Sequence, residues 1–146
     1  MPYSFQGNEN NASKAFAKEI NVSWRATNET CYNIVGMRVE EAIAFLKKVE
    51  LGDQHVHYRR YNKKIPHRTG GQPGRFPKKA AKVVRTLLES AKANAETLNI
   101  DSEKMRVAHA TAYKARTLQR MRPKGRLRHH NIELTNVEMV LKKTRA

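Results

Sequence analysis

The segment between Ala112 and Leu134 constrains the fold more than any other part of the chain. Between Lys114 and Arg128 it holds seven Lys or Arg residues and no acid. A proline followed two residues later by a glycine predicts a turn at Arg122–Arg126. Residues on either side recur at every second position, which is typical of strands. They are Met105, Val107, His109, Thr111 and Tyr113 before the turn, and Val137, Met139 and Leu141 after it.

These features predict a long β-hairpin over about residues 112–134. If each arm has about ten residues at ~3.3 Å per residue, the tip lies roughly 30 Å beyond the last apolar pair. Such an arm has almost no apolar face to bury, so it cannot be stable alone. We therefore expect a concave, polyanionic partner to receive it.

The charge of the whole chain supports the same expectation. The 146 residues suit a single domain, 1–146, with a formal net charge of +16 and a pI near 10.3. Ten Lys or Arg lie between Gln54 and Leu88 and nine between Lys104 and Ile132, and neither tract holds an acid. Most charge runs are solvated faces. Two tracts of this length favour a nucleic-acid partner instead, with an acidic membrane surface as the weaker alternative.

Other classes of protein are disfavoured by the sequence. No apolar run approaches the ~18 residues of a spanning helix, and the first residues lack the order of a signal peptide. The single Cys31 permits no internal disulfide and no zinc site of several cysteines. We therefore expect a reducing, cytosolic setting.

The remaining periodicities predict an edge strand and three helices. The strand covers 12–23, with Phe16, Ile20, Val22 and Trp24 on one face. The helices cover Trp24–Val35 after an N-cap at Ser23, Val39–Glu50, and Pro77–Leu98. The third helix has an apolar stripe, widened by Val83 and Leu88, and a basic stripe. The apolar stripe comprises Ala80, Val84, Leu87, Ala91, Ala95 and Leu98, and the basic one Lys78, Lys82, Arg85 and Lys92.

Residues 52–76 lack either periodicity and predict a long basic loop with three Gly near its end, two Pro and six basic residues. Tyr58 and Tyr61 flank Arg59 and Arg60. Aromatic rings next to guanidinium groups can stack on bases while the guanidinium groups hold phosphates. The alternative is a loop ordered only by its partner, with both tyrosines lying on the protein surface.

The six histidines do not indicate a metal or catalytic site. They form no recognised metal-ligand motif with Asp, Glu or Cys, so we expect no metal and no cofactor. A nuclease would need histidines that the fold brings together. We expect His129 and His130 to contact phosphates or bases, and we expect no enzymatic activity.

Several motifs resemble one known family, the large-subunit ribosomal protein twenty-two family, called seventeen in the older eukaryotic naming. They are Gly74-Arg75-Phe76-Pro77-Lys78-Lys79-Ala80-Ala81, Ala91-Lys92-Ala93-Asn94-Ala95-Glu96, Tyr58-Arg59-Arg60-Tyr61-Asn62, Gly36, Glu41-Ala42 and Gly125-Arg126. The resemblance extends over nearly the whole chain. The loop between Tyr58 and Gly74 resembles the archaeal and eukaryotic branch.

This resemblance implies an α+β fold, with three helices on a small antiparallel three-stranded sheet and a long protruding β-hairpin. It implies a structural protein of the cytosolic large ribosomal subunit whose partners are large-subunit rRNA, neighbouring ribosomal proteins and, at the exit tunnel, the nascent polypeptide. The expected rRNA-binding residues are Arg25, Arg59, Arg60, Tyr61, Lys63, Lys64, Arg68, Arg75, Lys78, Lys79, Lys82, Lys114, Arg116, Arg120, Arg122, Lys124, Arg126, Arg128 and His129. The expected tunnel-lining tip comprises Met121, Arg122, Pro123, Lys124, Gly125 and Arg126.

Another basic RNA- or DNA-binding protein without catalytic activity is the alternative. A DNA-binding protein would share the charge but would more often carry a recognition helix rich in base-reading residues. Here the basic density lies on the predicted hairpin and loop. RNA, recognised mainly through its shape and phosphates, is therefore the favoured ligand.

Overall fold

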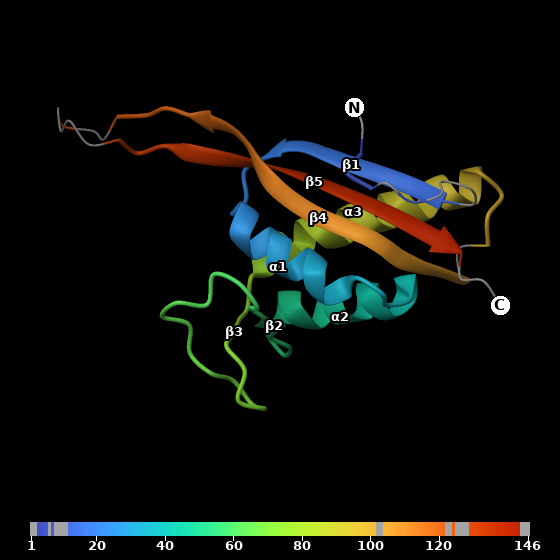
Figure 1. Ribbon diagram of the computed structural model, residues 1–146, viewed down its shortest axis with the longest axis horizontal. Helices are drawn as coiled ribbons and strands as arrows, with labels where there is room; N and C mark the ends of the chain where they lie inside the picture. The colour runs from blue at the N-terminus through green and yellow to red at the C-terminus, as the bar shows by residue number, and fades with distance from the viewer. Residues whose placement is uncertain are drawn as a thin grey trace.

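The computed structural model describes residues 3–5, 7, 12–101, 104–121, 124 and 129–143. Within these residues the elements are β1 (Ala12–Ile20), α1 (Trp24–Ile34), α2 (Val39–Leu51), β2 (Val56–His57), β3 (Gly74–Arg75), α3 (Lys78–Thr97), β4 (Met105–Leu118) and β5 (Ile132–Lys143). Strands β1, β5 and β4 form an antiparallel sheet in that order, and the three helices lie against one of its faces (Figure 1). The predicted α+β class is confirmed.

The central strand β5 supplies much of the core. Val137, Met139 and Leu141 alternate along it and are fully buried with residues of all three helices. Each such side chain contributes about 1.5–3 kcal/mol when it leaves water. Glu138, on the opposite face of the sheet, is also buried and accepts a hydrogen bond of 2.9 Å from the Ser4 backbone N–H. The predicted alternation in this strand is therefore confirmed.

The predicted alternation in β4 holds for the buried Met105 and Val107 but is wrong beyond them, because the strand contains a β-bulge. Val107 pairs with Leu141 but His109 pairs with Val140, so β4 holds one extra residue at this point. A bulge of one residue reverses the face on which the following side chains lie, here as far as the second register shift between Lys114 and Thr117. Ala112 is buried, and Tyr113, predicted to share a face with Met105 and Val107, is 41% exposed.

Strand β1 is an edge strand, as predicted, but it ends at Ile20 rather than at residue 23. Its buried side chains are Ser13 and Ala15, whereas Phe16 lies half-buried on the face that was expected to be covered. The Ser13 hydroxyl donates a hydrogen bond to the Ala91 carbonyl of α3. Small side chains on this face let the helix and the strand approach closely.

The helices begin and end within one or two residues of the predicted positions. Gly52 ends α2 in the left-handed region, at φ 103°, and its N–H bonds to the Lys48 carbonyl. Glycine is favoured here because other side chains are strained at that φ. In α3 the buried stripe stops at Ala95, and Leu98, expected to belong to it, is 58% exposed.

Strands β4 and β5 remain paired beyond the end of β1. Ile20 of β1 pairs with Thr135, and past this point β4 continues along β5 to the pair Leu118 and Ile132. These two strands form an extension that we call the β4–β5 arm, and Figure 1 shows it leaving the body. The predicted turn residues Arg122, Pro123, Gly125 and Arg126 lie outside the described residues.

Candidate nucleic-acid interface

Two basic extensions leave the body at the same end, where α1 begins (Figure 1). One is the β4–β5 arm and the other is the β2–β3 loop, which connects His57 to Gly74. Fourteen of the predicted binding residues that lie outside the tip have exposed side chains. They are Arg25, Arg59, Arg60, Tyr61, Lys63, Lys64, Arg75, Lys78, Lys79, Lys82, Lys114, Arg116, Arg120 and His129. The tip residues Met121 and Lys124 are also exposed, whereas Arg122, Arg126 and Arg128 lie outside the described residues.

The carboxylate of Glu29 holds the start of the β2–β3 loop. This side chain is only 1% exposed, and its two oxygens accept hydrogen bonds of 3.1 Å from the backbone N–H groups of Arg59 and Arg60. Hydrogen bonds to an ionised acceptor are stronger than neutral ones. Glu29 therefore fixes the backbone of both arginines while their side chains remain exposed.

Arg59 is further held by an aromatic ring. Its guanidinium carbon lies 3.5 Å from the centre of the Tyr32 ring on α1. A guanidinium group stacked in this way keeps its other face and its N–H edges available for bases and phosphates. Tyr32 was not among the predicted residues, because nothing in the sequence between them brings residues 32 and 59 together.

Tyr58 belongs to the core, and the expectation that its ring stacks on bases is wrong. The side chain is 4% exposed and packs in the same cluster as Cys31 and Ile65. Burial raises the pKa of its hydroxyl, while the nearby Arg75 acts in the opposite direction. The Arg59–Arg60 pair is therefore flanked by one buried tyrosine and one exposed tyrosine, Tyr61.

The β2–β3 loop is more ordered than its composition suggests. Strands β2 and β3 pair at its base, and the buried Ile65 anchors its middle to the body. Arg68, predicted to bind RNA, is half-buried, donates a 3.1 Å hydrogen bond to the Gly74 carbonyl and lies over the Phe76 ring. Its main contacts are therefore internal ones that close the loop.

Tyr61 meets α1 at the base of the loop. Its ring lies edge to face with the Trp24 ring, with centroids 5.3 Å apart. The Arg25 guanidinium lies 5.3 Å from the Trp24 centroid and 5.5 Å from that of Tyr61. The indole N–H of Trp24 donates a hydrogen bond of 3.1 Å to Glu133 of β5. These contacts join the loop, α1 and the β4–β5 arm.

Two cations of the arm are paired with acids. Lys114 lies 2.8 Å from Glu133, and Arg116 lies 3.5 Å from Glu19. The hydrogen bonds from Lys114 and Trp24 lower the pKa of the Glu133 carboxyl. Exposed pairs of this kind contribute little stability and can exchange partners. Both cations can therefore turn to a phosphate.

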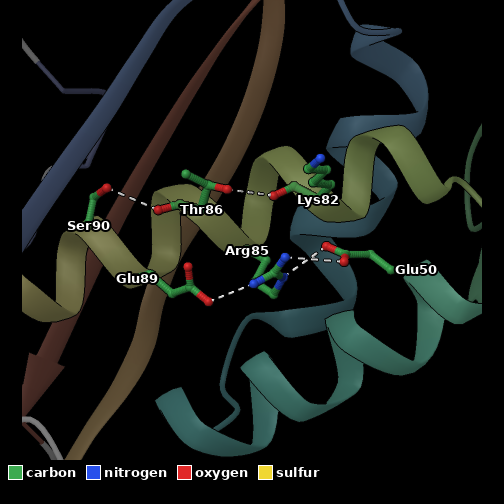
Figure 2. A network of polar contacts seen from close by, with 6 residues as sticks. All are labelled: Glu50, Lys82, Arg85, Thr86, Glu89 and Ser90. Atoms are coloured by element: carbon green, nitrogen blue, oxygen red, sulfur yellow. Dashed lines mark hydrogen bonds and ion pairs between the residues drawn. The ribbon is translucent and has the colours of Figure 1, made fainter.

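The predicted basic stripe on α3 is divided into two parts. Figure 2 shows Arg85 bound to Glu50 of α2, at 2.9 Å, and to Glu89 on its own helix. Lys92, nearer the end of the helix, lies 3.9 Å from Glu40. Arg85 and Lys92 therefore join α3 to α2, and neither of them is among the predicted binding residues.

The remaining basic residues of α3 lie at its N-terminal end. Lys79 and Lys82 are exposed. Lys78 is also exposed, and its ammonium donates a 2.9 Å hydrogen bond to the Leu51 carbonyl at the end of α2. Cations favour such helix C-termini. The candidate interface on α3 is thus its first turns, next to the β2–β3 loop.

Neither a metal site nor a membrane span is found in the described residues. No three His, Cys, Asp or Glu side chains among them gather closely enough to hold a metal ion. In the same part of the chain, no helix is both long and apolar enough to cross a membrane.

The interface contains residues that the sequence reasoning missed. Glu29, Tyr32, Trp24 and Glu133 position its basic side chains or its exposed rings. The sequence gives only a weak signal for these positioning residues. Glu29 and Glu133 are acids in a strongly basic chain, and Trp24 is its one tryptophan.

Comparison with known proteins identifies the family. Residues 15–142 match the ribosomal protein L22p/L17e family. The large ribosomal subunit protein uL22 of Methanococcus aeolicus is 34% identical over 146 aligned positions, which cover 97% of this chain and 95% of the relative. The uL22 proteins of Methanocaldococcus jannaschii and Methanothrix thermoacetophila are 36% and 38% identical, covering 97% and 94% of this chain and 94% and 93% of their own lengths. The chain therefore belongs to the ribosomal protein L22p/L17e family, in its archaeal type.

Proposed function

We propose that this protein binds large-subunit rRNA through its β2–β3 loop, the start of α3 and the β4–β5 arm, and that the tip of the arm lines the nascent-peptide exit tunnel. The coarser part of this function follows from the family, whose members are structural, non-enzymatic ribosomal proteins. The name of the relatives, large ribosomal subunit protein, supports the same subunit as the location. Its partners would be rRNA, neighbouring ribosomal proteins and the nascent polypeptide on a cytosolic ribosome.

The observation that carries the RNA-binding proposal is the placement of charge. The chain holds 29 Lys or Arg and 13 Asp or Glu, and two acid-free tracts supply most of the exposed cations at one end of the body. RNA segments repel each other through their phosphates. A protein that places cations on two separate extensions can neutralise two such segments at once.

The chemistry of the side chains fits phosphate binding without base-specific readout. A guanidinium group spans two phosphate oxygens with parallel N–H donors and can stack on a base. Glu29 holds the backbone of Arg59 and Arg60 while their side chains remain exposed, so little backbone rearrangement is needed before they contact a phosphate. Contacts to phosphates set position and affinity, and recognition is mainly of RNA shape.

Sedimentation tests the location. In cells that produce the protein with an epitope tag, it should travel with the large ribosomal subunit through a gradient at high salt. Recovery only in the soluble fraction would contradict the proposal. A filter-binding comparison at fixed salt separates RNA from DNA, because structured RNA should bind more tightly than duplex DNA of equal length.

A further inference from the structure

We propose that Tyr61, Trp24 and Arg25 form a binding site for one unpaired RNA nucleotide, with its base stacked on the exposed Tyr61 ring and its phosphate on Arg25. This site rests on the proposed RNA-binding function and adds a base-dependent contact to a surface that otherwise binds phosphates.

The first support is the exposure of the rings. Tyr61 is 41% exposed, although its ring already touches Trp24. The two rings meet edge to face, at an interplanar angle of 79°, so neither ring covers the whole face of the other. A nucleobase is a flat π surface of similar size, and stacking on an exposed ring accepts any base.

The second support is the backbone of Tyr61. Its φ is 54°, in the left-handed region, which is unfavourable for a residue with a side chain. Such conformations persist where the surroundings hold them, and they cluster at ligand-binding positions. Here the contacts with Trp24 and Arg25 hold the ring against α1.

The third support is the way in which Trp24 is oriented. Its indole N–H donates to Glu133, which also accepts a hydrogen bond from Lys114. The ring that supports Tyr61 is therefore fixed by the β4–β5 arm, so the site exists only where loop, helix and arm meet. Glu133 is a positioning residue and does not itself contact the nucleotide.

The charges around the rings select the ligand. Arg25 and Lys114 outnumber Glu133, and the exposed Lys63 and Lys64 follow Tyr61 within three residues. An aromatic site for a cationic ligand, such as a methylated amine, would not carry a guanidinium within 5.5 Å of both rings. An aromatic surface beside an excess of cations suits a planar ring joined to an anion, as in a nucleotide.

The test uses the full-length protein and two probes of equal charge, a short single-stranded oligouridylate and the same ribose-phosphate chain without bases. Because Trp24 is the one tryptophan, its fluorescence reports directly from the site. We expect oligouridylate to change this fluorescence and the abasic chain to change it much less. Tyr61→Leu should weaken binding of oligouridylate by about 5- to 150-fold, the range for one stacked base, and leave binding of the abasic chain within about twofold.

Three further variants make the result specific. Tyr61→Phe keeps the ring and should bind both probes as the wild type does. Tyr113→Leu removes a ring of equal exposure, 41%, outside this cluster, and should not change the preference for the base-containing probe. Arg25→Gln should lower the slope of log affinity against log salt by about 0.7 for either probe, as expected for one lost phosphate contact. Circular dichroism and the melting temperature check that each variant is folded.

The possible failures are distinguishable. If the wild type binds both probes equally, or if Tyr113→Leu and Tyr61→Leu act alike, the nucleotide site is wrong while RNA binding stands. If the wild type binds neither probe even at low salt, the proposed RNA-binding function fails as well.

Discussion

Glu29→Gln tests whether a buried carboxylate orders the RNA-binding loop. The wild-type side chain accepts two hydrogen bonds of 3.1 Å, from the backbone N–H groups of Arg59 and Arg60. Hydrogen bonds to a charged acceptor contribute roughly 1.5–3 kcal/mol each, and a neutral one about 1 kcal/mol. The glutamine keeps one oxygen, so one neutral bond remains, and it turns an NH₂ group toward the other donor.

The loss is reduced by two effects. Removing the charge removes the cost of keeping an ionised group 1% exposed, and the loop can open locally so that water reaches the freed N–H groups. We therefore expect a decrease of about 2 kcal/mol in the free energy of unfolding. With a urea m-value of about 2 kcal/mol per molar, this lowers the unfolding midpoint by about 1 M. Amide exchange at residues 59 and 60 should become much faster.

The RNA affinity gives a result whose sign separates two mechanisms. If Glu29 acts only as a negative charge near a basic surface, removing the charge strengthens RNA binding. If it acts by holding Arg59 and Arg60 in place, the variant binds RNA more weakly despite its higher net charge, and this is the outcome that we expect. The control is Glu89→Gln on α3, which removes a 45% exposed partner of Arg85 and should change stability by less than about 0.5 kcal/mol. Unchanged exchange at residues 59 and 60 together with tighter RNA binding would refute the reasoning.

Three further results are expected. Leu88→Ala should lower the free energy of unfolding by about 2–5 kcal/mol in urea titrations because the side chain is fully buried, whereas Leu98→Ala at 58% exposure should have little effect. Trp24 fluorescence should change with pH, with a midpoint below the ordinary carboxyl pKa of 4.5, because the pKa of Glu133 is lowered. The ionised Glu133 accepts the indole hydrogen bond, so this bond is present above the lowered pKa and is lost as the pH falls through it. Glu133→Gln should abolish this titration. Finally, four exposed cations can be replaced together by alanine: Arg59, Arg60, Lys63 and Lys79. In filter binding to single-stranded RNA, this change should lower the slope of log affinity against log salt by up to about 3. A decrease in slope of less than about 1 would count against their role in binding phosphates.

Local patterns predicted the elements whose stability depends on local contacts. Helix α2 runs from Val39 to Leu51, within one residue of the predicted end, because its apolar spacing and the glycine after it are both local signals. The edge position of β1 was also predicted, since a lysine interrupts its apolar face. The β4 bulge at residue 108 could not be predicted, because it depends on the pairing with β5 and leaves no mark in composition.

The candidate site divides in the same way. Its basic residues could be predicted because phosphate binding requires charge, and charge can be counted in a sequence. The residues that position them could not, since Glu29 acts on a backbone 30 residues away and Trp24 bonds an acid 109 residues away. Tyr58 and Tyr61 are equivalent in the sequence, and only packing against the core makes one buried and the other exposed.

The positions of the acids determine which cations remain for RNA. Glu50, Glu89 and Glu40 bind Arg85 and Lys92 on the part of α3 that faces α2, so these cations stabilise the body. Within the described residues, the acids next to the two basic extensions bind backbone N–H groups, an indole or cations that are themselves exposed. An exposed ion pair contributes little, so a phosphate can replace the carboxylate at small cost. The chain therefore uses its acids to hold the helices together and to orient the interface, and it leaves the positive charge of the loop and arm for the polyanion.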